Sequence, residues 1–132
     1  MIGGIHGIGI DTVLVERIRR ARARWGARFL DRVFTLRERS LCGEGPSADR
    51  RLAARFAAKE AALKALGTGL SGGLAWRDVE IVGGVDQRPS IVLHGRAAAW
   101  AASQGVARLH VSMSHDGPLA TALVIAEGRD RA

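Results

Sequence analysis

The chain lacks tyrosine and is poor in cysteine and proline, with one cysteine and three prolines among 132 residues. The single cysteine, Cys42, excludes an internal disulfide and any cysteine-based zinc or redox motif. No stretch approaches the roughly 18 apolar residues that a membrane-spanning helix needs, and the first residues lack the pattern of a signal peptide. Because 47% of the residues are hydrophobic, the sequence predicts one folded domain over residues 1–132, located in the cytoplasm and without a membrane partner.

Lysine is also scarce, and its position is informative. Lys59 and Lys64 are the only lysines, so arginine supplies the rest of the 20 basic residues. An ammonium group is a compact point charge, whereas a guanidinium group is a wide planar fork. Two lysines within six residues of an otherwise arginine-rich chain therefore indicate a crowded phosphate or metal site.

Both lysines lie in a predicted long helix whose apolar stripe is formed by Leu52, Phe56, Leu63 and Leu66. Lys59 falls within this stripe, so its stem is expected to be packed and its amine directed to a defined position. Glu60 lies at the edge of the stripe, and Lys64 lies one turn further along. Spacing alone favours an exposed Glu60–Lys64 pair worth about 0.2–0.5 kcal/mol, while the scarcity of lysine favours a functional site.

Residues 5–11 have the pattern of a buried strand in which isoleucines alternate with glycines. The glycines would allow another backbone or a ligand to approach closely. Asp11 is predicted to end this strand. Its position favours a role as N-cap of the next helix, in competition with Thr12, over the alternative role of metal ligand.

The remaining pattern predicts an α+β fold, an antiparallel sheet packed with the long central helix. A helix is predicted over 13–25, broken at Gly26 and resumed over 27–40. Ser47 or Asp49 is expected to cap the central helix after a loop, and Gly67 to end it. Trp100 is expected to be a core anchor. The other predicted elements are strands at 79–82, 90–93, 109–114 and 120–125 and a short helix at 95–104.

The net charge of +7 is confined to one segment. Residues 17–39 contain nine arginines against Asp31 and Glu38, which gives 9 − 2 = +7 and leaves the remainder neutral. A localised excess indicates an acidic partner, although a solvated face is the common alternative. The pI of about 11.3 also suggests a nucleic-acid-binding module. The chain has no known nucleic-acid-binding motif and no expected exposed aromatic platform, so no nucleic-acid partner is predicted.

Metal-binding candidates are limited to oxygen ligands. The four histidines show no spacing typical of a transition-metal site. The carboxylates of Asp11 and Glu60, together with phosphate oxygens, would instead suit Mg²⁺, which binds hard oxygen ligands and usually keeps several waters.

Three motifs together resemble the holo-acyl-carrier-protein synthases, the small bacterial branch of the 4′-phosphopantetheinyl transferases. They are Gly-Ile-Asp at 9–11, Arg-Phe-Ala-Ala-Lys-Glu-Ala at 55–61 with Lys64 and Gly-Thr-Gly at 67–69, and His-Val-Ser-Met-Ser-His at 110–115. The resemblance runs from about residue 3 to Glu127. One departure is Gln87-Arg88-Pro89, which stands where the family usually has Gly-Lys-Pro, and the loop over 40–50 also differs.

The resemblance implies an enzyme that moves the phosphopantetheine arm of coenzyme A onto a carrier-protein serine and releases adenosine 3′,5′-bisphosphate. It implies that Asp11 and Glu60 hold Mg²⁺ on the pyrophosphate and that the catalytic residues are Glu60, Lys64 and His115. It also implies contacts with coenzyme A from Arg55, Lys64, Gly67, Thr68, Pro89 and His115. The base that deprotonates the serine is left open among Glu60, a metal-bound water and a water near His115.

The resemblance also predicts partners. An acidic acyl carrier protein is expected to dock on Arg17, Arg20, Arg24, Arg28 and Arg32. Arg17, Arg20 and Arg24 share one helical stripe, and Arg17, Arg28 and Arg32 align with the family's carrier-contacting positions. The carrier would belong to fatty-acid or secondary-metabolite biosynthesis. A homotrimer with active sites at the subunit boundaries is expected from the resemblance alone.

Overall fold

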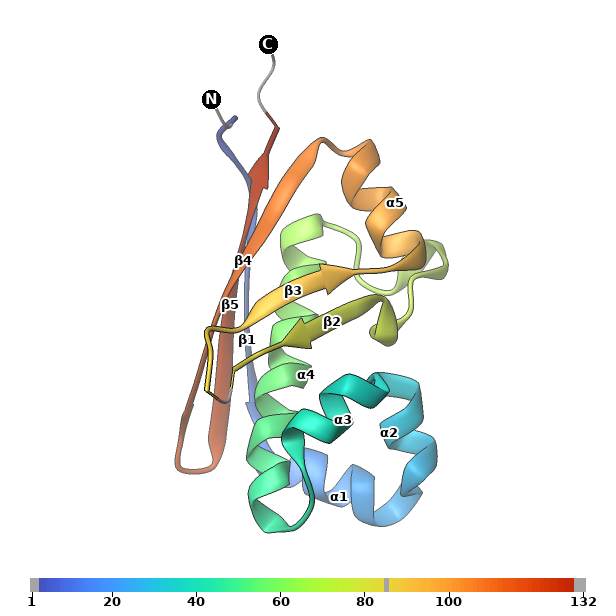
Figure 1. The fold of residues 1–132 in the computed structure, drawn as a ribbon, viewed down its shortest axis with the longest axis vertical. Helices are drawn as coiled ribbons and strands as arrows, with labels where there is room; N and C mark the ends of the chain where they lie inside the picture. Colours follow the sequence, from blue (N-terminus) through green and yellow to red (C-terminus); the bar gives the residue numbers. More distant parts are fainter. Residues whose placement is uncertain (1–2, 85, 130–132) are drawn as a thin grey trace.

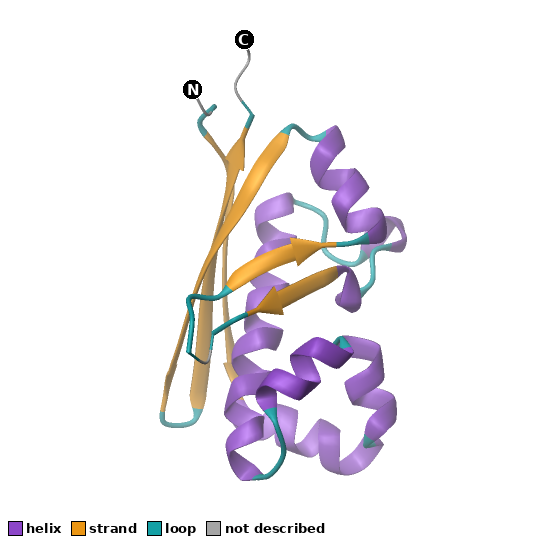
Figure 2. Ribbon diagram, in the orientation of Figure 1, coloured by secondary structure: helices purple, strands orange, loops and turns teal. Residues whose placement is uncertain are grey.

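A computed structural model describes residues 3–84 and 86–129 of the chain. Its elements confirm the predicted α+β class (Figure 2). In chain order they are β1 (Ile5–Leu14), α1 (Val15–Trp25), α2 (Ala27–Val33), α3 (Leu36–Cys42), α4 (Pro46–Leu66), β2 (Val79–Val82), β3 (Ser90–Leu93), α5 (Gly95–Ser103), β4 (Val106–Asp116) and β5 (Leu119–Gly128), with short 3₁₀ turns η1 (Ser71–Gly73) and η2 (Trp76–Asp78) before β2.

Three strands form an antiparallel sheet in the order β1–β5–β4, and β2 and β3 form a separate antiparallel pair. Figure 1 shows α4 running along the larger sheet, with α1, α2 and α3 gathered at one end of the molecule and α5 at the other. Ala122 of β5 pairs with Asp11 of β1 on one side and with Met113 of β4 on the other. The strands predicted at 79–82 and 90–93 are confirmed with the same bounds.

The contact between α4 and the sheet depends on small residues. The alanines of α4 at positions 57, 58, 61 and 62 are completely buried. A Cβ atom added to Gly9 would collide with the carbonyl group of Ala61, and one added to Gly7 would collide with that of Ala65. The two glycines therefore do allow a close approach, as predicted, and the group that approaches them is the backbone of α4.

Strand β1 differs from its prediction in length and burial. It continues to Leu14, so Asp11 lies inside the strand, and neither Asp11 nor Thr12 is a helix cap. The side chains of Ile8 and Ile10 are each 59% exposed. The prediction of a buried strand was wrong because only the glycine side of β1 meets α4, while its isoleucine side lies on the outer face of the sheet.

The helices around α4 also differ in their ends. The predicted helix at 27–40 is two helices, separated where Phe34 takes an extended conformation and Thr35 forms a capping box with Glu38. The N-cap of α4 is Gly45, so Ser47 and Asp49 lie within its first turn rather than capping it. Gly67 ends α4 in a left-handed conformation, as predicted. No helix in the described part of the chain combines the length and hydropathy needed to cross a membrane.

A fully buried ion pair joins α3 to α4. The ammonium of Lys59 lies 2.7 Å from Glu38 Oε1, and both side chains have no exposed area. Lys59 also donates to the carbonyl groups of Trp76 and Val79, while Glu38 accepts from the backbone amide of Ile81. Burying two charges is costly unless they are paired and hydrogen-bonded, and these contacts meet that requirement. They also hold the Lys59 amine in one defined position, which confirms the prediction.

Candidate active site

Lys64 and Asp11 form an ion pair between α4 and β1. The ammonium Nζ of Lys64 donates to Asp11 Oδ1 at 3.2 Å and to the carbonyl oxygen of Ile10 at 2.9 Å. The Lys64 side chain is 53% exposed and that of Asp11 is 19% exposed, so the ammonium is oriented and still accessible. No salt bridge joins Glu60 and Lys64 among the described residues. Lys64 therefore pairs with Asp11 rather than with Glu60, the partner that helical spacing alone favoured.

Glu60 shares the electrostatic environment of this pair. Burial raises the pKa of Glu60, the negative charge of Asp11 raises it further, and the positive charges of Lys64 and Arg17 lower it. Mutual repulsion of this kind requires two carboxylates that lie close together. The fold thus brings Asp11, Glu60 and Lys64 to one location, which we call the carboxylate site.

The carboxylate site has the ligand set expected for a hard cation. No group of three or more His, Cys, Asp or Glu side chains in residues 3–84 and 86–129 is arranged to hold a metal ion. A cation bound by Asp11 and Glu60 would therefore take its other ligands from substrate oxygens and water, which is the usual coordination of Mg²⁺ at phosphate-binding sites.

A second candidate site is a basic cavity of about 500 Å³ between the β2–β3 connection and the end of β4. We call it the Arg55 pocket. Its lining includes Arg51, Arg55, Gln87, Pro89, Ser114 and His115, and no acidic side chain from residues 3–84 and 86–129. The buried Arg55 donates to the carbonyl oxygen of Gly83 at 2.6 Å, and within the described residues its Nε has no partner. Two arginines without an opposing carboxylate suit an anionic ligand such as phosphate. Arg51 was not among the residues predicted from the sequence.

The two sites are on different sides of one chain. Arg55 and Lys64 are nine residues apart on α4, so their side chains leave the helix roughly 180° apart. Asp11 lies on β1 and His115 on β4, with β5 between them, which separates the two strands by roughly 10 Å. The fold therefore groups Asp11, Glu60 and Lys64 and separately groups Arg55, Pro89 and His115, and it does not bring the two groups together.

Gly67 and Thr68 line a third cavity, of about 600 Å³, between the end of α4 and helix α5. We call it the α5 pocket. Trp100 forms part of its wall and is 37% exposed, so the prediction that Trp100 is a core anchor was wrong. Its indole N–H instead donates to the carbonyl oxygen of Leu66, the last residue of α4, at 3.1 Å.

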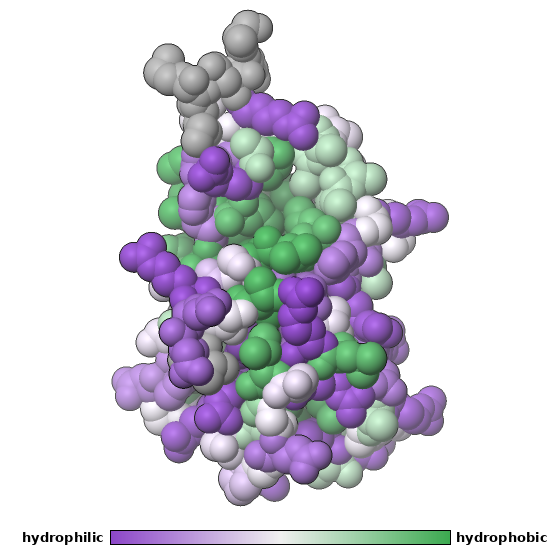
Figure 3. Space-filling view, viewed as in Figure 1, coloured by the Kyte–Doolittle hydropathy of each residue, from purple (hydrophilic) through white to green (hydrophobic). Residues whose placement is uncertain are grey.

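The arginines of residues 17–39 divide into paired and unpaired groups. Arg19 and Arg20 pair with Glu16, and the other paired arginines are Arg22 with Asp49, Arg37 with Glu80 and Arg39 with Asp31. Of the predicted carrier-binding residues, Arg20 is therefore already partnered. The four with no salt bridge in the described part of the chain are Arg17, Arg24, Arg28 and Arg32. Figure 3 shows mainly hydrophilic side chains at the end of the molecule where α1, α2 and α3 lie.

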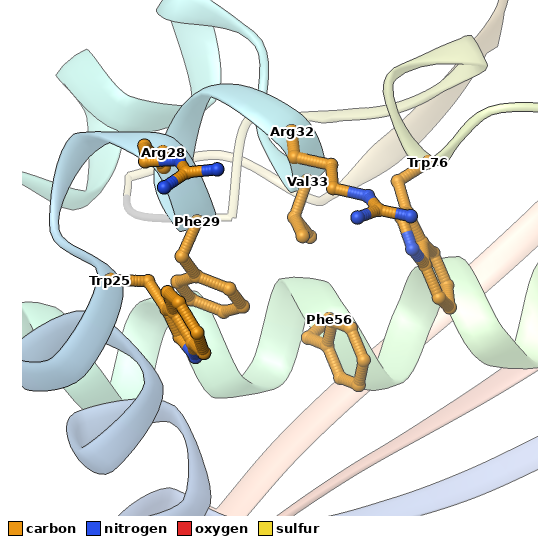
Figure 4. Close-up of a pocket in the computed structure, with 7 residues that line it drawn as sticks. All are labelled: Trp25, Arg28, Phe29, Arg32, Val33, Phe56 and Trp76. Atoms are coloured by element: carbon orange, nitrogen blue, oxygen red, sulfur yellow. The ribbon is translucent and has the colours of Figure 1, made fainter.

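Arg28 and Arg32 border an aromatic pocket of about 550 Å³ that was not predicted from the sequence. In Figure 4 both arginines extend from α2, opposite Phe56 on α4, and Arg32 reaches toward Trp76. The pocket is completed by Trp25, Phe29 and Val33. Trp25 is 50% exposed, so the expectation of no exposed aromatic surface was wrong. Its lining comes from α1, α2, α4 and η2, and no local pattern brings these together.

Comparison with known proteins identifies the family. The model of the 4′-phosphopantetheinyl transferase superfamily matches residues 7–124. A holo-[acyl-carrier-protein] synthase of Koribacter versatilis is 48% identical over 123 residues, which cover 93% of this chain and 98% of that protein. A second one, of Desulforudis audaxviator, is 50% identical over 124 residues, which cover 94% of each chain.

Solved structures agree with this assignment. The holo-[acyl-carrier-protein] synthase of Neisseria meningitidis superposes with a TM-score of 0.83 and 34% identity over 92% of this chain and 98% of that one. The Helicobacter pylori enzyme, solved in complex with coenzyme A, gives a TM-score of 0.79 and 32% identity over 90% of this chain and 98% of that one. The chain therefore belongs to the holo-[acyl-carrier-protein] synthases of the 4′-phosphopantetheinyl transferase superfamily.

Proposed function

We propose that this protein transfers the 4′-phosphopantetheine arm of coenzyme A to a serine of an acyl carrier protein and releases adenosine 3′,5′-bisphosphate. The observation that carries the proposal is the carboxylate site, where Lys64 is held against Asp11 beside Glu60. Phosphoryl transfer needs charge neutralisation and positioning more than covalent help. An oriented ammonium beside two carboxylates supports this chemistry.

The donor set of the carboxylate site fits Mg²⁺. The negative charge of Asp11 adds to burial in raising the pKa of Glu60, and a bound divalent cation would favour the ionised form of Glu60. Bound there, Mg²⁺ would supply Lewis-acid neutralisation of the pyrophosphate. Lys64 would contact a phosphate oxygen through the part of its ammonium that faces solvent. Its hydrogen bonds to Asp11 and the Ile10 carbonyl would hold that charge in position before the substrate arrives.

The Arg55 pocket fits the nucleotide end of coenzyme A. Arg51 and Arg55 line the cavity, and none of the described acidic side chains does, which favours a phosphate group that is not bridged by metal. Because this pocket lies on the opposite side of α4 from Lys64, one molecule of coenzyme A would bridge the carboxylate site of one chain and the Arg55 pocket of another. Arg55, Pro89 and His115 would then act on a neighbouring subunit's reaction.

Such sharing requires assembly, and the outer face of the large sheet supports it. The apolar side chains exposed on β1 and β5 are Ile5, Ile8, Ile10, Leu14, Leu119 and Leu123. A contiguous apolar face of this kind is uncommon on a monomer and is typical of a subunit interface. A homotrimer closed through this face would place active sites at the subunit boundaries.

The carrier protein would dock at the opposite end of the molecule from α5. Among the described residues Arg17, Arg28 and Arg32 form no salt bridge; Arg28 and Arg32 line the aromatic pocket, and the Arg17 guanidinium lies over the ring of Phe56, which also lines it. An acidic helix with one apolar side chain would match this surface, with the acidic groups on the arginines and the apolar side chain in the pocket. Phe56 lies one helical turn before Glu60, so a carrier docked there would bring its serine to the carboxylate site.

The proposal is tested by incubating the protein with coenzyme A and an apo acyl carrier protein. We expect release of adenosine 3′,5′-bisphosphate and a mass increase of the carrier equal to one phosphopantetheine arm, both abolished by a chelator and restored by Mg²⁺. A carrier with its acceptor serine replaced by alanine is the control. Absence of transfer with several acidic carriers in Mg²⁺ would contradict the proposal.

A further inference from the structure

We propose that Lys59 is a positioning residue for carrier recognition, because its buried ammonium joins both walls of the aromatic pocket to α4 next to Glu60. The inference rests on the proposed function and extends it to a residue that touches neither substrate. The Lys59 side chain has no exposed area, so it acts only through the groups that it holds. Those groups belong to η2 on one side of the pocket and to α2 and α3 on the other.

All three N–H groups of the Lys59 ammonium are used inside the protein. They meet three acceptors, which are Glu38 Oε1 at 2.7 Å, the carbonyl oxygen of Trp76 at 3.1 Å and the carbonyl oxygen of Val79. A phosphate ligand would need at least one free donor. Lys59 therefore differs from Lys64, whose side chain is half exposed, and its charge serves to hold protein segments together.

The bond to Trp76 fixes the η2 wall of the pocket, which Figure 4 shows facing Phe56 of α4. Trp76 lines the aromatic pocket, and its ring packs against that of Phe56 with 5.0 Å between the centroids. The backbone of Trp76 is bonded to Lys59, which comes three residues after Phe56 on the same helix. The backbone and the ring of Trp76 are therefore both attached to one turn of α4.

The α2 wall is attached to the same ammonium. The ring of Phe34, which follows α2, has its centroid 5.7 Å from Lys59 Nζ, within the range of a cation–π contact. Phe34 packs edge to face against Phe29 of α2 with 6.1 Å between the centroids, and Phe29 lines the aromatic pocket. Glu38 bonds Lys59 and also accepts from the backbone amide of Thr35 at 2.9 Å, which fixes the start of α3.

This arrangement suits positioning. A buried ion pair is an inefficient stabiliser, because the cost of desolvating two charges offsets most of their attraction, and its directed bonds instead hold the joined segments in one arrangement. Lys59 directly precedes Glu60, so one turn of α4 carries both the attachment of the pocket walls and a carboxylate of the reaction site. A carrier side chain seated in the pocket is thereby held at a defined distance from the carboxylate site.

Binding of coenzyme A depends much less on Lys59. The Arg55 pocket is attached to α4 by its own bond, from Arg55 to the carbonyl oxygen of Gly83 at 2.6 Å. In the carboxylate site, Lys64 bonds to Asp11 without a contact from Lys59. The two substrates should therefore respond differently when the buried pair is altered.

The test changes the pair in two ways. Glu38→Asp keeps both charges and shortens the link between α3 and Lys59 by one methylene group. The double variant Glu38→Gln/Lys59→Met removes both charges together, so that neither is buried without its partner. Val106→Ala, a truncation in the core at the end of the molecule where α5 lies, is the control for a loss of stability alone. KM and kcat for the carrier and for coenzyme A are measured under conditions where denaturant unfolding shows each variant to be folded.

A fluorescence measurement tests the position of Trp76 without any substrate. In a Trp25→Phe/Trp100→Phe background, Trp76 is the only tryptophan, and quenching by acrylamide reports how accessible its ring is. The two changes of the pair and the Val106→Ala control are introduced into this background.

We expect both changes of the pair to raise KM for the carrier on the order of tenfold, because even a small displacement of a substrate-positioning element is costly. KM for coenzyme A should stay nearly unchanged, and Trp76 should be quenched more strongly than in the background protein. Val106→Ala should match its parent in all three measurements. If the double variant does not fold, Glu38→Asp alone decides the outcome.

The inference is overturned if KM for the carrier does not rise, if both KM values rise equally, or if the quenching of Trp76 is unchanged. Failure of the proposed function would appear separately, as a wild-type enzyme with no transfer activity. The quenching of Trp76 would then still show whether the pair holds this wall of the pocket.

Discussion

Lys64 and Asp11 form a hydrogen-bonded ion pair, 3.2 Å between Nζ and Oδ1, although 53 positions separate them in the chain. The contact connects α4 to the edge strand β1 and holds a positive charge beside Asp11 and Glu60. It also means that each charge of the carboxylate site has an opposite charge nearby before any substrate binds. The function of the site depends on how these three charges act together.

Removal of either carboxylate should abolish turnover. We expect Asp11→Ala or Glu60→Ala to lower kcat by at least about a hundredfold, because charge neutralisation at the pyrophosphate is lost. Glu60→Ala should not lower the free energy of unfolding, because the charge of Asp11 and burial both disfavour the ionised Glu60. Asp11→Ala also removes the ion pair with Lys64 and should lower it by about 0.2–1 kcal/mol. Steady-state kinetics and denaturant unfolding measure the two effects. Glu44→Ala, at an exposed position, is the control, and wild-type rates in chelator would contradict the metal site.

Catalysis should require an ammonium group, rather than any positive charge, at position 64. Lys64→Arg keeps the charge, but the planar guanidinium is wider than the point charge that bonds Asp11 and the Ile10 carbonyl. We expect kcat to fall on the order of tenfold or more with stability nearly unchanged. Kinetics at saturating coenzyme A measure this. An arginine variant with normal kcat would mean that position 64 requires only a positive charge.

Unpaired arginines should control recognition of the carrier. Reversal of Arg17 and Arg28 to Glu should raise KM for the carrier and leave KM for coenzyme A nearly unchanged, with a stronger effect at low salt. Single exposed pairs contribute only about 0.2–1 kcal/mol, so the double reversal is the informative variant. Reversal of Arg108 and Arg129 is the control with equal net charge. If neither ionic strength nor the two reversals changes the KM for the carrier, this surface is only a solvated face and the prediction is wrong.

Two inactive variants should restore activity to each other if sites are shared between chains. Lys64→Ala disables the carboxylate site, and His115→Ala disables the Arg55 pocket. Refolding them together in equal amounts should recover about one quarter of wild-type activity, because each site draws its two halves at random. Lys64→Ala refolded with Glu60→Ala is the control and should stay inactive, since both lesions lie in the same half. Recovery no greater than in this control would argue for sites built from one chain.

The buried pair of Glu38 and Lys59 should be essential for stability. Glu38→Gln leaves the ammonium of Lys59 buried without its counterion, which should cost about 3–5 kcal/mol at neutral pH. Burial lowers the pKa of Lys59 below its ordinary value of 10.5. The unfolded state then binds more protons, so the variant should recover stability as the pH rises toward 10.5. Urea unfolding at several pH values measures this. Glu44→Gln is the control, and a variant as stable as wild type would show that the pair contributes little.

The sequence pattern correctly predicted features that depend on residues close together in the chain. The apolar stripe of α4, its glycine end and the strands at 79–82 and 90–93 were found because periodicity and turn residues are local signals. The predictions were wrong where contacts with a distant segment of the chain determine the burial or the length of an element. The isoleucines of β1 have the pattern of a buried strand, but α4 covers only the glycine side. Asp11 has the sequence context of a helix cap, but β5 extends β1 beyond it to Leu14.

The sequence by itself determined the family and the chemistry at stake, because Asp11, Glu60 and Lys64 stand in a specific motif and because two lysines are distinctive among so many arginines. Only the tertiary structure decided how those residues are used. It paired Lys64 with Asp11, buried Lys59 against Glu38, separated Arg55 and His115 from the carboxylate site, and assembled the aromatic and α5 pockets. The physical reason is that burial and electrostatic pairing depend on distances between segments far apart in the chain, and periodicity does not encode those distances.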